Sequence, residues 1–353
     1  MRIPIAALLA CAYLTSASSA QTVVFDEGFE TGLAQWTATG MWHAVAAGGA
    51  CLGFASPFPE GTHAVWYGRV STCDYDDGLA NSGRLQSNTW ITLPANAASV
   101  SLYFKSSQET EACWHGEDVH SYVLEFQSGL VTTGLLCYES ESPVMPTAGF
   151  VPWYERRIDL TDHRGMTLRF AFQFATNNTV ENGLLGWLID DVRVVAEPGR
   201  TFCPSPVVPS ACPCDAILDV GGGCRNSLYR SATLQSGGVA SVALDTLSFT
   251  AAEMPPGTAA TLFQGTSPVT TPIVFGDGVL CLSGSLTRLG TQFAPSGSAV
   301  WPLAGNGPIS SAGGVPPPGG DRYYQVVYRD AVPGQCTSAT FNQTGAQRVS
   351  WQP

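Results

Sequence analysis

The stretch ETEACWHGEDVH, from Glu109 to His120, holds the densest grouping of side chains able to bind metal or move protons. Its candidates are His115, Glu117, Asp118 and His120. Their order departs from HExxH, in which two histidines on one helical face share a zinc ion, and no helical period accompanies them. We therefore interpret this stretch as a solvated loop.

Two further sets of residues have side chains of catalytic type. Glu109 and Glu111 stand one residue apart on the same face of a strand, a pair that a glycosidase could use, but no ExDxxE signature surrounds them. His43, His63 and His163 are isolated and no GxSxG or cysteine nucleophile motif accompanies them. The sequence therefore predicts no catalytic site.

The cysteines of the chain could form disulfides or bind zinc. The chain has 11 cysteines, and without Cys11, which lies in the leader described below, ten remain, an even number typical of a secreted disulfide framework. The ten are Cys51, Cys73, Cys113, Cys137, Cys203, Cys212, Cys214, Cys224, Cys281 and Cys336. Zinc at Cys212, Cys214 and Cys224 is the alternative, but their CPC spacing is not the CxxC of zinc sites. Proximity in sequence favours Cys51–Cys73 and Cys113–Cys137 among the three pairings that the first four cysteines allow.

The N-terminal residues predict export. Arg2 precedes an apolar run from Ile3 to Leu14 and small residues ending at Ala20, the pattern of a signal peptide covering residues 1–20. That run is shorter than the roughly 20 residues of a membrane-spanning helix, and no later stretch is long and apolar enough, so we expect no membrane span. The expected location is secreted, extracellular or at the cell surface.

The net charge of the chain limits the classes of molecule that it is expected to bind. The formal net charge is -12, it becomes -13 when Arg2 leaves with the leader, and Lys105 is the only lysine. Phosphate binding needs clustered Lys and Arg, so nucleic acid is not an expected partner.

Short alternating segments separated by Gly and Pro predict an all-β chain of two domains. The expected strands are Ser99–Phe104, Tyr122–Phe126, Leu168–Phe174, Trp187–Val195, Val239–Leu244, Thr261–Gln264 and Tyr323–Tyr328. Residues 199–230 are predicted to be a Cys/Pro/Gly-rich linker, or a knot at the base of the second domain. Residues 309–321 are predicted to be an exposed loop.

The first domain, residues 21–198, resembles the MAM-like and carbohydrate-binding-module-like jelly rolls of secreted bacterial proteins. The resemblance rests on the opening FETGLAQW, on HAVWYG, YDDG and SGRLQS in the middle, and on the closing IDDV. It implies that the first and last strands are neighbours. It also implies that Glu30 and Asp190 are calcium ligands, with Asp191 beside them.

A bound Ca²⁺ would relieve the repulsion between these acids, because calcium takes six to eight oxygen ligands. A solvated sheet edge is the alternative, and Asp26 and Glu27 are weaker candidates because they precede the matching motif. Trp66 and Trp187 are expected to be packed in the core, and Trp114 is the expected surface aromatic.

Residues 231–353 are predicted to form a second, smaller β-sandwich. Together with the preceding cysteines they resemble a repeat domain at the C-termini of secreted bacterial proteins of unknown role. The motifs that carry this resemblance are FCP, CPC, GCRNS, FGDGVLCLSGSLTRLG and CTSATFNQTGAQRVSWQP. Cys281 is expected to pair with Cys336, while the four preceding cysteines close the knot.

These observations favour a secreted, non-catalytic binding or adhesion protein that contacts glycan or a cell-surface protein through a calcium-stabilised jelly roll. Two alternatives remain open at this point. One is a secreted hydrolase, a glycosidase or peptidase relative, whose site cannot be seen in one sequence. The other is a structural component of the cell envelope.

Overall fold

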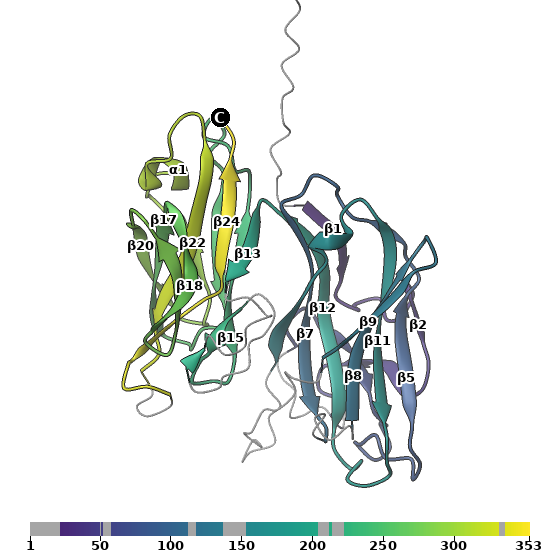
Figure 1. Ribbon diagram of the computed structural model, residues 1–353. Helices are drawn as coiled ribbons and strands as arrows, with labels where there is room; N and C mark the ends of the chain where they lie inside the picture. The colour runs from purple at the N-terminus through teal and green to yellow at the C-terminus, as the bar shows by residue number, and fades with distance from the viewer. Residues whose placement is uncertain are drawn as a thin grey trace, which may run out of the picture.

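The computed structural model of the chain describes residues 22–49, 51, 58–111, 118–136, 153–203, 212–213, 222–331 and 336–353. β-Strands dominate these residues, and they form two sandwiches that lie side by side (Figure 1). The prediction of an all-β fold is confirmed. No helix in the described part of the chain is long and apolar enough to cross a bilayer.

The first sandwich comprises two sheets from residues 22–197. One has the order β10(Tyr154–Asp159), β7(Ser99–Glu109), β12(Gly186–Glu197), β4(His63–Tyr67), β3(Trp42–Ala46), and β1(Thr22–Glu27) also pairs with β12. The other has the order β2(Trp36–Ala38), β5(Ser82–Ser87), β11(Thr167–Thr176), β8(Asp118–Phe126), β9(Val131–Leu135), and β6(Ile91–Thr92) also pairs with β11. A short 3-10 helix, η3(Thr161–His163), precedes β11.

Aromatic residues fill the space between these two sheets. Phe172 of β11 is fully buried and packs against Trp36, Phe104 and Trp187, which come from both sheets. Trp66 is also buried, as expected, and its indole nitrogen donates to the carbonyl of Leu185 at 2.7 Å. Period-two alternation places every second side chain in this core and the intervening ones on the outer faces.

The second sandwich spans residues 199–353. Its larger sheet has the order β13(Gly199–Cys203), β24(Ala346–Trp351), β22(Gly320–Arg329), β17(Thr258–Gly265), β20(Thr287–Ala294), and β23(Phe341–Gln343) also pairs with β22. A four-stranded sheet has the order β14(Gly222–Arg225), β15(Ser231–Gly237), β16(Ser248–Ala252), β21(Ala299–Trp301), and β18(Ser267–Phe275) pairs with β19(Gly278–Ser283).

Buried amide side chains join the sheets of the second sandwich. Gln325 is fully buried, donates to the carbonyls of Val279 and Thr344 and accepts from the Cys281 amide. Gln347 donates to the Leu234 carbonyl at 2.7 Å. These amides thereby supply hydrogen-bond partners to buried backbone groups.

Three local expectations differ from the structure in whole or in part. Val239–Leu244 is not a strand: it follows Gly238, whose φ is 75°, and makes isolated bridges, one of them from Ser241 to Gln352. The expected loop at 309–321 contains a short helix, α1(Ile309–Gly313), which is held by hydrogen bonds from Ser310 to Asp245. The segment 199–230 contributes β13 and β14 to the sheets of the second sandwich.

The disulfides follow the expected pattern in part. Cys51 is bonded to Cys73, as predicted, and Cys212 is bonded to Cys224. Cys281 is bonded to Cys203, so the Cys281–Cys336 prediction is wrong, as is the expectation that Cys203 bonds within the knot. Cys336 is also disulfide-bonded. The predicted pair Cys113–Cys137 and the residue Cys214 lie outside the described residues.

Candidate functional sites

Three carboxylates converge where β1 meets β12. Asp26 of β1, Glu60 in the segment before β4, and Asp191 of β12 each place a carboxylate oxygen within 4.8 Å of the others. Antiparallel pairing sets Asp26 opposite Arg193, and a β-bulge between Asp190 and Arg193 turns the backbone of Asp191 to φ 49°. The bulge re-aims the Asp191 side chain.

Asp190 lies beside this group and is fully buried. Its two oxygens accept from the backbone amides of Glu60 at 3.2 Å and Asp191 at 2.8 Å. Burial raises the pKa of Asp190 to about 7, although these two hydrogen bonds lower it. Burial also raises the pKa of Asp191, against the lowering effect of Arg193 and Lys105. Four acidic side chains therefore lie in one place, with oxygen donors of the kind that hard divalent cations prefer.

Glu30 does not join this group. Its carboxylate accepts from the backbone amides of Thr62 at 2.9 Å and His63 at 2.8 Å, and from the Thr62 hydroxyl at 3.1 Å. The hydrogen bond from His63 and then that from Thr62 lower the pKa of Glu30. The structure thus brings Asp191 together with Asp26 and Glu60, where the resemblance implied Glu30 with Asp190.

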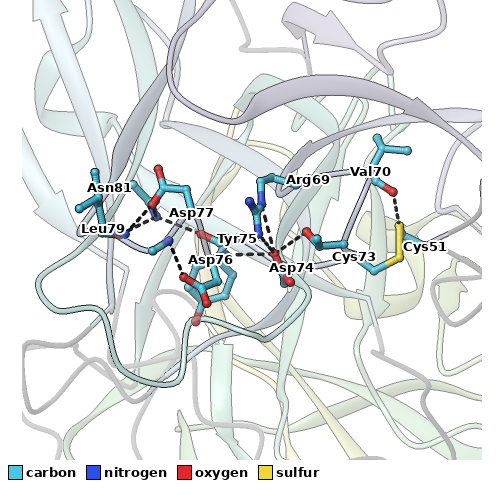
Figure 2. A network of polar contacts seen from close by, with 12 residues as sticks. Cys51, Arg69, Val70, Cys73, Asp74, Tyr75, Asp76, Asp77, Leu79 and Asn81 are labelled. Carbon is cyan, nitrogen blue, oxygen red and sulfur yellow. Dashed lines mark hydrogen bonds and ion pairs between the residues drawn. A yellow bond between two sulfur atoms is a disulfide. The ribbon is translucent and has the colours of Figure 1, made fainter.

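A second acidic segment, residues 69–81, uses its carboxylates internally (Figure 2). Asp74 accepts from the Arg69 guanidinium at 2.8 Å, and Asp77 accepts from the Asn81 amide at 3.3 Å. The Cys51–Cys73 disulfide lies directly before Asp74 (Figure 2). These contacts give the segment a structural role.

The expected solvated loop is partly a core strand. Asp118 and His120 belong to β8 and are fully buried, so the loop prediction is wrong for them, whereas His115, Glu117 and Trp114 lie outside the described residues. Burial, with a smaller effect of Arg156, lowers the pKa of His120 to about 3, and its ring packs against Phe174 and Trp187.

The acids near this strand also make structural contacts. Asp118 accepts a short hydrogen bond from the Tyr75 hydroxyl, and also one from the Glu111 amide at 2.9 Å. Glu109 accepts from the Leu185 amide at 3.2 Å. β7 ends at Glu109 and Glu111 is buried beyond it, so the two acids do not form an open pair on one strand face.

A different group of polar side chains occupies the outer face of the β2-β5-β11-β8-β9 sheet. Glu125 of β8 is bonded to Arg84 of β5 and accepts from Gln86 at 3.0 Å and from Arg169 of β11 at 2.8 Å. The Arg169 guanidinium also lies over the ring of Trp90, 4.9 Å from its centroid. We call these five residues, Arg84, Gln86, Trp90, Glu125 and Arg169, the outer-face array.

The array is held in place and partly open to solvent. Trp90 is 40% exposed, and the side chains of Arg84 and Arg169 are about one-third exposed. Partial burial raises the pKa of Glu125, but the hydrogen bond from Arg169 and the charge of Arg84 outweigh it, so the pKa lies below its ordinary value. Glu125 is therefore an ionised acceptor between two guanidinium donors.

No family model matches this chain, and no curated protein matches it. Among solved structures it is similar to TmCBM61 in complex with β-1,4-galactotriose, with 17% identity over 48% of this chain and 94% of that chain and a TM-score of 0.32. It is also similar to the CBM22-1 xylan-binding domain of Paenibacillus barcinonensis Xyn10C, with 13% identity, 50% and 96% coverage and a TM-score of 0.28. The CBM22-1–CBM22-2 tandem of the same enzyme covers 95% of this chain and 99% of its own length, with 11% identity and a TM-score of 0.29. Similarities at these identities and TM-scores establish neither a family nor a function for the chain.

Proposed function

We propose that this protein is a secreted, non-catalytic binding protein whose first sandwich holds a glycan on the outer-face array. The observation that carries the proposal is the placement of an exposed tryptophan beside a fixed set of planar hydrogen-bonding groups on one sheet face. Disulfides in both sandwiches support an oxidising, extracellular compartment.

Sugar chemistry matches this arrangement. A pyranose ring has an apolar face of C–H groups, which packs on an aromatic side chain, and a rim of hydroxyls that donate and accept hydrogen bonds. Trp90 offers the aromatic surface. Glu125 accepts, the guanidinium groups donate, and the Gln86 amide does both. Because these polar groups already bond one another, little side-chain entropy remains to be lost when a ligand binds.

Titration calorimetry with neutral β-linked oligosaccharides of galactose, xylose, mannose and glucose tests this proposal. We expect binding to at least one of them, and Trp90→Ala to weaken it about tenfold or more, a loss of about 1.4 kcal/mol. Phe293→Ala is the matched control, because Phe293 is 64% exposed on the second sandwich. Equal affinity of the Trp90→Ala variant and the parent protein would exclude the array as the binding site.

We further propose that Asp26, Glu60, Asp190 and Asp191 hold a structural Ca²⁺ in the first sandwich. Support comes from the convergence of three carboxylates and from the buried fourth, whose raised pKa marks a site where negative charge is costly without a cation. Such an ion would neutralise this charge and stabilise the junction of β1 with β12.

Thermal unfolding with and without chelator tests the ion. A cation present at a hundredfold excess over its dissociation constant stabilises by about 2.7 kcal/mol, so we expect chelator to lower the Tm by about 5 to 10 °C. Asp191→Asn should abolish most of this response, whereas Asp162→Asn, at an exposed acid in η3, should leave it intact. A Tm that chelator does not change in the parent protein contradicts the calcium proposal and leaves the glycan proposal standing.

A further inference from the structure

The only lysine of the chain lies between the two sandwiches. Lys105, on the outer face of β7, contacts Glu155 of β10 at 3.7 Å within its own sandwich and Glu253 of the second sandwich at 3.1 Å. The Glu155 and Glu253 side chains are only 5% and 8% exposed. A single, partly buried cation is thus shared by two buried acids from different sandwiches.

Three cations and two acids alternate across the junction around Lys105. Arg193 of β12 pairs with Glu155 at 3.1 Å, and Arg230 of the second sandwich pairs with Glu253 at 3.1 Å. The amide of Gln235 in β15 donates to Glu155 at 2.8 Å, and the Glu155 backbone amide donates to Glu253 at 3.1 Å. We call these six residues, Lys105, Glu155, Arg193, Arg230, Gln235 and Glu253, the junction cluster.

Charge complementarity of this kind specifies one arrangement. Burial lowers the pKa of Lys105, but Glu155 and Glu253 outweigh it and the pKa lies above its ordinary value. A buried ion pair adds little net stability when complete, yet removing one partner leaves an uncompensated buried charge. Any other docking of the two sandwiches would remove the contact of Lys105 with Glu253 and that of Gln235 with Glu155.

We propose that the junction cluster is an electrostatic latch that holds the two sandwiches in one fixed orientation, so that they behave as a single rigid body. Shorter contacts near the crossing from β12 to β13 assist it: Ser99 donates to the Gly199 carbonyl at 2.6 Å, and the Gly199 amide donates to Ser236 at 2.9 Å. The latch uses the sheet opposite the outer-face array, so a ligand on that array remains accessible. In Figure 1, β7 and β12 lie closer to the second sandwich than β5 and β2 do.

Acetylation of Lys105 in the full chain measures the closed state directly, because no other side chain carries an amine. Mass spectrometry of the modified peptide should show Lys105 reacting about tenfold more slowly in the native protein than in urea. Glu253→Gln should remove most of this protection with an unchanged far-UV spectrum. Asp321→Asn, which breaks an exposed ion pair with Arg348 inside the second sandwich, should preserve it.

A double-mutant cycle separates the latch from simple destabilisation. We expect Lys105→Met and Glu253→Gln each to increase the radius of gyration in solution scattering, and Lys105→Arg and the double variant Lys105→Met/Glu253→Gln to retain the parent value. If the double variant is as expanded as the single ones, or if Lys105 reacts in the native protein as fast as in urea, the latch is refuted.

Discussion

Glu197 is the last residue of β12, and its replacement by glutamine should stabilise the protein at alkaline pH. The side chain is fully buried, accepts from the hydroxyls of Tyr103 at 2.9 Å and Ser99 at 3.3 Å, and lies 3.7 Å from Arg157. Burial raises the pKa of Glu197 from 4.5 to about 7, although Arg157 and the two hydroxyls lower it. The desolvation of the carboxylate therefore exceeds the attraction of its partners.

The sign and size of the effect follow from the two pKa values. Below pH 4.5 Glu197 is protonated in both the folded and the unfolded chain, so it changes the free energy of unfolding little. Between pH 4.5 and 7 it ionises first in the unfolded chain, which lowers stability as pH rises. Above pH 7 the loss is complete, and the difference of about 2.5 between the pKa values corresponds to about 3 kcal/mol.

Urea unfolding at pH 4 and pH 8, followed by tryptophan fluorescence, measures this difference. The Glu197→Gln variant should match the parent protein at pH 4 and exceed it at pH 8 by up to about 3 kcal/mol. Arg157 keeps its hydrogen bond to Ser101 at 2.9 Å in the variant. Glu181→Gln, at an exposed position, is the control and should show no such divergence. A variant less stable than the parent at pH 8 would refute the reasoning, because the Arg157 pair would then outweigh desolvation.

Two further predictions concern stability. Phe172→Ala should lower the free energy of unfolding, measured in urea, by roughly 3–5 kcal/mol, because it opens a cavity beside Trp36 and Trp187. A loss below about 1 kcal/mol would mean that this core is loosely packed. Replacing both Cys203 and Cys281 by serine should lower the free energy of unfolding by about 4 kcal/mol, since their disulfide closes a loop with a sequence separation of 78. An unchanged melting temperature of the second sandwich in calorimetry would contradict this.

The strands of the first sandwich could be predicted because their alternation is long. Leu168–Phe174 and Trp187–Val195 each present one apolar face, and both lie within observed strands. Val239–Leu244 has a similar pattern but only six residues after a turn, and it meets the C-terminal residues through isolated contacts. Alternation over so few residues does not distinguish a strand from an irregular segment that is buried on one side.

The candidate sites depend on contacts that a single sequence does not encode. Glu60 comes from an irregular segment with no motif, and the bulge at Asp191 decides which way that acid points. The outer-face array had a visible signal in the alternation of Arg84 with Gln86, but its assembly with Glu125 and Arg169 requires the register between strands. Cys203 pairs with Cys281 because β13 and β19 meet in space, which spacing alone does not reveal.

The first sandwich cannot complete its folding until β12 has been synthesised. This strand is bonded to β4 and β7 and also pairs with β1, so three strands from the earlier part of the chain have no complete sheet until it is present. During synthesis the N-terminal part of the chain is made first. The apolar faces of β1, β4 and β7 therefore stay exposed until β12, which ends at Glu197, has been synthesised. Pairings this distant in sequence form slowly, and the exposed edges invite mispairing in the interval. A chain truncated before Gly186 should accordingly aggregate rather than fold.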